Sequence, residues 1–163
     1  MSSERSFVCK LGGFSDSNPE IVTIFPEFGF SPSESKELLS NCLPEGCKDG
    51  EFRINDFGKG NIISYIFRNP RKDGRDDLIS YSILLKKGEN PEVYVKLLKE
   101  VFETLKRSNL LTEEILIQNL EHLYEGLNTW TDITIEGFKV NLSSLYKNLQ
   151  EKNIKPKLKG SFF

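Results

Sequence analysis

Two segments in the middle of the chain are apolar at nearly every position, and they constrain the fold more than any other feature. Residues Asn61–Arg68 and Asp77–Lys86 are rich in Ile, Leu, Phe and Tyr, with few polar positions between them. Strands of this kind belong in the interior of a sheet that is covered on both faces. We therefore expect helices on both sides of a sheet, with Tyr65, Phe67, Tyr81 and Ile83 buried in central strands.

Further strand signals flank this pair. Phe7–Leu11, Glu20–Phe25 and Glu51–Asn55 contain β-branched or aromatic residues and are bounded by Gly or Pro on at least one side. Together with Asn61–Arg68 and Asp77–Lys86 they predict five strands. The last three follow one another closely and are expected to form an antiparallel meander.

Helix signals lie between and after the strands. The sequence "SPSE" combines a Ser cap, a Pro suited to the first helical position and a capping-box Glu, and it predicts a helix from about Pro32 to Cys42. Apolar residues recur at helical spacing over Pro91–Leu105, and Thr112 can cap a further helix that reaches Leu127. The predicted fold class is α/β of the α+β type: a five-stranded antiparallel sheet with one helix on one face and two on the other.

Residues 129–163 are predicted to form an extension to a domain that occupies residues 1–128. In the extension, "DITIEGFKV" predicts one strand or a hairpin, and Leu142–Leu149 marks a short amphipathic helix. The basic tail beyond it is either a frayed end or a docking segment for an acidic surface or a lipid headgroup. We expect the extension to fold back over the sandwich and cover the groove beside the first helix, because Trp130 and Phe138 need apolar contacts.

Composition excludes several classes of protein. A net charge of −2 argues against a general nucleic-acid binder, which needs a broad basic surface. The cysteines Cys9, Cys42 and Cys47 include no C-x-x-C pair and accompany a single histidine, which excludes a standard zinc site and a disulfide framework. No segment approaches the ~20 apolar residues that cross a bilayer. We expect a cytoplasmic protein without metal or cofactor, peripheral at membranes only through a partner.

Enzyme motifs are missing or incomplete. The chain has no G-x-x-x-x-G-K-[ST] phosphate loop, and "GFSDS" at 13–17 lacks the surroundings of a nucleophile elbow. "DFGKGN" at 56–61 matches a kinase triplet without the other kinase elements, and it fits a turn between two strands. We interpret His122 as a solvated side chain on the polar face of its helix, and Cys42 and Cys47 as buried or incidental thiols. The chain is therefore predicted not to be an enzyme.

The order strand, strand, helix, three strands, helix, helix over Phe7–Leu127 resembles the longin domain, an α-β-α sandwich of vesicle-trafficking proteins and small-GTPase regulators. The stretches that carry the resemblance are "GGFSDSNPEIVTIFPE", the capped helix after it, "GEFRINDFGKGNIISYIFRNPRKDGRDDLISYSILL", "NPEVYVKLLKEVFETLKRS" and "TEEILIQNLEHLYEGLN". Stand-alone archaeal longins are similar. The resemblance implies a module that binds a small GTPase, or a longin- or roadblock-type partner, in trafficking or nutrient signalling.

The resemblance also implies a peptide groove. Longin relatives that act as SNAREs bind a peptide between the first helix and the neighbouring strand. Here that groove would involve Leu38, Leu39, Phe52 and Ile54. Another hypothesis is a structural subunit that forms homodimers or heterodimers through a sheet edge.

The loop "RNPRKDGR" at 68–75 carries four cations and joins the two apolar strands. Folliculin and the nitrogen permease regulator-like proteins place an arginine just before the last sheet strand, as a finger on a Rag-type GTPase. Only Arg75 matches that position, and Arg71 is a second partner-binding candidate in the loop. A finger in trans would make the chain a GTPase-activating subunit. The alternative is a solvated hairpin tip whose arginine is held by the neighbouring acids, Asp73, Asp76 and Asp77.

Overall fold

The two apolar segments form neighbouring strands inside one antiparallel sheet. The computed structural model describes residues 3–13 and 17–151 of the chain. The sheet has the order β2-β1-β5-β4-β3, and every neighbouring pair is antiparallel. The strands are β1 (Ser3–Leu11), β2 (Glu20–Phe25), β3 (Glu51–Phe57), β4 (Gly60–Asn69) and β5 (Asp77–Leu85). The predicted burial is confirmed, since Tyr65, Phe67, Tyr81 and Ile83 are all buried.

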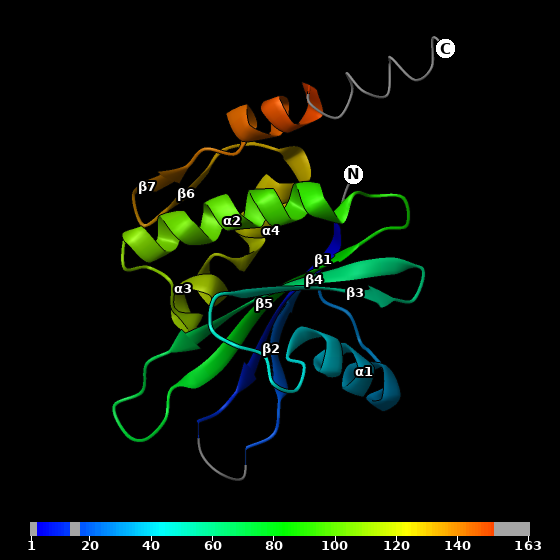
Figure 1. Cartoon of the computed structure of the whole chain (residues 1–163), viewed down its shortest axis with the longest axis vertical. Coiled ribbons are helices and arrows are strands. Elements are labelled where there is room, and N and C mark those ends of the chain that lie inside the picture. The colour runs from blue at the N-terminus through cyan, green and yellow to red at the C-terminus, as the bar shows by residue number, and fades with distance from the viewer. Residues whose placement is uncertain (1–2, 14–16, 152–163) are drawn as a thin grey trace.

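Helices cover both faces of the sheet (Figure 1). The first, α1 (Pro32–Cys42), contacts β2 to β5 from one side. On the other side lie α2 (Pro91–Arg107), α3 (Glu113–Gln118) and α4 (Leu120–Thr129). The predicted capping box of α1 is present: the Ser31 hydroxyl accepts from the Glu34 N–H at 3.2 Å, and the Glu34 carboxylate accepts from the Ser31 N–H at 3.0 Å.

The helix predicted from Thr112 to about Leu127 is two helices, α3 and α4, joined at Asn119. The backbone N–H and the side-chain amide of Asn119 both donate to the carbonyl of Ile115, at 3.1 and 2.9 Å. This local side-chain bond competes with the regular helical ladder and ends α3. His122 follows the break and is exposed, as the sequence predicted.

The C-terminal extension contains a hairpin, β6 (Ile133–Ile135) and β7 (Phe138–Val140), and a helix over residues 143–151. The expectation that it covers a groove beside α1 is wrong, because Ile133, Ile135 and Val140 pack into the core on the α2 side of the sheet. Phe138 is 48% exposed and was also expected to be packed.

The Asp132 carboxylate joins the start of the extension to the start of its helix. Asp132 accepts hydrogen bonds from the backbone N–H of Leu142 and of Ser143, both at 3.0 Å, and from the Ser143 hydroxyl at 2.9 Å. The Trp130 ring stacks on Tyr146 with centroids 3.8 Å apart. The predicted basic tail, 152–163, lies outside the described residues. Among the helices that the structure does describe, none has the length and apolarity needed to cross a bilayer.

Candidate functional site

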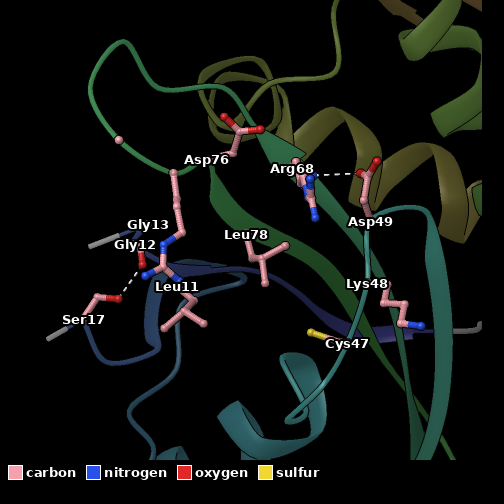
Figure 2. Close-up of a pocket in the computed structure, with 12 residues that line it drawn as sticks. Leu11, Gly12, Gly13, Ser17, Cys47, Lys48, Asp49, Arg68, Asp76 and Leu78 are labelled. Atoms are coloured by element: carbon pink, nitrogen blue, oxygen red, sulfur yellow. Dashed lines mark hydrogen bonds between the residues drawn. The ribbon is translucent and has the colours of Figure 1, made fainter. Parts of the chain in front are cut away.

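The β4–β5 loop borders a cavity of about 690 Å³ at one end of the sheet, which we call the loop-end pocket. Its walls come from the end of β1, the α1–β3 connection, the end of β4 and the start of β5 (Figure 2). Leu11 and Leu78 contribute apolar surface, and Lys48, Arg68 and Arg75 contribute three cations. The loop itself extends past the end of the sheet (Figure 1).

A buried carboxylate organises this end of the sheet. The side chain of Asp77, the first residue of β5, is 8% exposed. One of its oxygens accepts from the Gly13 N–H at 2.8 Å and lies 3.5 Å from the Arg71 guanidinium. The other oxygen lies 3.7 Å from the Lys10 ammonium. Asp77 is therefore paired with Arg71 and Lys10, which places Arg71 in a structural ion pair.

Arg75 lies beside this ion-pair cluster but outside it. Its side chain is exposed, and no hydrogen bond or ion pair to another described residue holds it. The backbone of Arg75 packs directly against the backbone of Gly13. A Cβ added to Gly13 would lie only 2.0 Å from the Arg75 carbonyl oxygen. Gly74 precedes it with φ +83, a conformation that L side chains rarely adopt. The loop thus fixes the main chain of Arg75 and leaves its guanidinium in solvent.

Two more cationic residues, Arg68 and Lys48, line the opposite wall of the pocket, where the Lys48 side chain points outward (Figure 2). The Arg68 N–H donates to the Asp49 carboxylate at 2.9 Å, and the Arg68 side chain points into the pocket (Figure 2). The Lys48 N–H donates to the Glu51 carboxylate at 2.8 Å, and this bond is the main reason that the pKa of Glu51 is lowered. Asp49 and Glu51 therefore use their carboxylates to shape the backbone, which leaves both cationic side chains available to an anion.

The nucleophilic groups near the pocket are not activated. Burial and the charge of Glu51 raise the pKa of the Cys47 thiol, which keeps it protonated. The Ser17 hydroxyl donates to the Gly12 carbonyl. Within the described part of the chain, no group of three or more His, Cys, Asp or Glu side chains has the arrangement of a metal site. The arrangement is therefore suited to binding a phosphate or carboxylate group through guanidinium and ammonium donors.

The groove predicted from Leu38, Leu39, Phe52 and Ile54 is not assembled. Leu38 and Leu39 belong to the core under α1. Phe52 pairs across the sheet with Tyr65 and Ile54 with Ile63, on the opposite, α2 face. Residues directly opposite each other in an antiparallel pair lie on the same face of the sheet. The register of β3 on β4 therefore determines the face on which Phe52 and Ile54 lie, and this register cannot be derived from the sequence alone.

The apolar groove that does border α1 has a different position. It has a volume of about 640 Å³ and runs from Leu39 and Leu43 to the end of β1 and the start of β5. It shares Leu11, Cys47 and Leu78 with the loop-end pocket, so an apolar groove and a cationic pocket adjoin. Sequence reasoning named Arg75, which lines the loop-end pocket, but not Arg68, Lys48 or Leu43, because the local pattern did not show that three separate connections converge there.

Comparisons of the chain with protein-family models and with curated proteins found no match. Function is therefore inferred from the geometry of the loop-end pocket and from the order of strands and helices.

Proposed function

We propose that the chain is a non-enzymatic, longin-type interaction module that binds a small GTPase or its regulatory complex through the loop-end pocket. The observation that carries the proposal is the position of Arg75: an exposed guanidinium on a projecting loop whose buried acid, Asp77, is already paired with Arg71. An α+β sandwich with a five-stranded antiparallel sheet is compatible with the longin resemblance. Fold alone does not specify function, so the GTPase assignment depends on that resemblance.

The pocket offers a partner two kinds of contact. Arg68, Arg75 and Lys48 supply charge for an acidic or phosphorylated group, and arginine can meet such a group with two parallel hydrogen bonds. The adjoining groove beside Leu39 and Leu43 supplies apolar area. Apolar contact with a few charged anchors is the usual composition of a specific protein interface.

The test is binding of purified small GTPases from the organism that encodes the chain, each loaded with GDP or with a non-hydrolysable GTP analogue. We expect one nucleotide state to bind more tightly, and Arg75→Ala with Arg68→Ala to weaken that binding roughly tenfold or more. Lys96→Ala, an exposed cation on α2, is the matched control and should bind like the wild type. Equal affinity for the two nucleotide states would contradict the proposal. An equal loss of affinity in Lys96→Ala would also contradict it.

The exposure of Arg75 also favours a second candidate function, in which the chain supplies an arginine finger in trans. A finger stabilises the charge that develops on the transferred phosphoryl group, so its loss lowers hydrolysis by on the order of 10³-fold or more. Single-turnover GTP hydrolysis should then be stimulated by the wild type and lost in Arg75→Lys, because lysine lacks the planar fork. Lys72→Ala, from the same loop, should retain stimulation. If the chain binds the GTPase but does not stimulate GTP hydrolysis, the arginine-finger function is contradicted and the proposal of a non-enzymatic module stands.

A further inference from the structure

The two edges of the sheet are built differently. The β3 edge carries Glu51, Arg53 and Asp56, and such charges discourage pairing with another chain. The β2 edge has the sequence EIVTIF, in which Glu20 at the start is the one charged residue. Pro19 and Pro26 lie just outside the strand. The β2 edge therefore lacks the side chains that protect an edge from pairing.

The outer side of β2 also has an open backbone. Its inner side pairs with β1, from Ser6 opposite Phe25 to Lys10 opposite Glu20, with one shift of register between Val8 and Cys9. No loop or helix in the described part of the chain makes a backbone hydrogen bond to residues 20–25. The outward N–H and C=O groups of this strand are therefore available to an additional strand.

A groove of about 720 Å³ follows this edge, between Ile21–Ile24 on one side and Glu27–Phe30 on the other. The second wall is held in place by Arg5, which donates to the Pro26 carbonyl at 2.8 Å and lies 4.4 Å above the ring of Phe28. Phe28 contacts Phe30 edge to face and is still 49% exposed. The groove thus presents an ordered aromatic side chain, which reduces the entropy that binding would cost.

We propose that β2 pairs with β2 of a second copy, antiparallel about a two-fold axis, and that this joins two sheets into one. A two-fold interface uses the same patch twice, so it requires a self-complementary strand. In this pairing Glu20 of one copy comes to the Phe25 end of the other, where Arg5 lies. Within the described residues, Arg5 is bonded to carbonyl oxygens and has no carboxylate partner. This complementarity favours a second copy over an unrelated peptide, and the interface is separate from the loop-end pocket.

The first test is the mass of the full chain in solution, measured by sedimentation or light scattering from roughly 1 to 100 µM, the range of a moderate dimer. We expect a concentration-dependent dimer. Thr23→Lys places two like charges near the two-fold axis and should raise the dissociation constant at least tenfold. Ile54→Lys, at a 45% exposed position of the β3 edge, is the matched control and should leave the dimer intact.

Phe28→Ser is a second variant that leaves the strand sequence unchanged, and it should also weaken the dimer. If circular dichroism shows that Thr23→Lys does not fold, Phe28→Ser becomes the variant that tests the proposed dimer. A wild type that stays monomeric over the whole range would overturn the proposal. A dimer that Ile54→Lys disrupts and Thr23→Lys does not would also overturn it, because the other edge would then be the interface.

Discussion

The hydrophobic core on one face of the sheet is larger than the core on the other face. On the α2 face, three helices and the C-terminal extension bury a core that includes Tyr65, Phe67, Tyr81 and Phe102 (Figure 1). On the α1 face, a single helix covers a smaller core in which thiols and hydroxyls accompany the apolar side chains. Those small polar groups belong to Cys9, Cys42, Ser64, Ser80 and Ser82, all buried.

The difference has a geometric cause and a functional consequence. A helix is about 10 Å wide, whereas five strands spaced roughly 4.8 Å apart span about 20 Å. One helix therefore cannot cover the whole face. The loop-end pocket, the apolar groove and the β2 groove all include residues of α1 or of its connections, such as Cys47, Leu43 and Ser35. We infer that the α2 face provides stability and that the margins of the α1 face provide binding surfaces.

The largest expected loss of stability comes from a truncation in the core on the α2 face. Phe102 is 1% exposed, stacks on Tyr65 with centroids 4.4 Å apart and meets Tyr81 edge to face at 5.4 Å. Phe102→Ala leaves a cavity that helices on several sides cannot fill, and should lower the free energy of unfolding by about 3–5 kcal/mol. Urea denaturation measures this change. A loss under about 1 kcal/mol would show that the core on the α2 face repacks, and the two faces would then not differ in this respect.

Leu38→Ala is the corresponding test on the α1 face. Leu38 is fully buried, but α1 is attached by exposed connections and can settle onto the sheet. The expected loss in unfolding free energy is about 2–3 kcal/mol, at the low end of the range for such truncations. The same denaturation series measures it. A loss larger than that of Phe102→Ala would reverse the assignment of the two faces.

A pH titration probes the α2 face independently of cavity formation. Burial raises the pKa of Tyr81 well above its usual value, even though its hydroxyl bonds to Ser6 at 3.0 Å. Because the folded pKa exceeds the unfolded value of about 10, the contribution to stability is full below pH 10 and is lost as pH rises. The slope approaches about 1.4 kcal/mol per pH unit. Stability measured between neutral and strongly alkaline pH should fall less steeply in Tyr81→Phe, and equal slopes would contradict this.

The smallest effect belongs to the hydroxyl pair under α1. The Ser64 and Ser82 hydroxyls are buried and 2.7 Å apart. Ser82→Ala removes one partner of a buried hydrogen bond and should cost about 1 kcal/mol, whereas the double change to Ala should cost less. A double-mutant cycle separates the pair from the two single effects. Additive losses would mean that the two hydroxyls do not interact.

Much of the local structure was predictable because its causes are local. The bounds Pro32–Cys42 and Glu20–Phe25 were predicted correctly, since a capping box and two flanking prolines act within a few residues. The nearly unbroken apolar runs in β4 and β5 required cover on both faces, and the structure has it. The break at Asn119 was missed because a side-chain bond to Ile115 outweighed an otherwise helical pattern.

The order of residues was enough to locate the strands and helices of the sandwich, to require cover on both faces of the sheet, and to place an arginine-rich loop between two central strands. Tertiary contacts were needed to show which arginine is available: Asp77 pairs with Arg71 and leaves Arg75 in solvent. They were also needed to show that Phe52 faces away from α1. The reason is that cross-strand register and the approach of Gly13 to Arg75 join residues far apart in sequence, whereas composition and periodicity report only on neighbours.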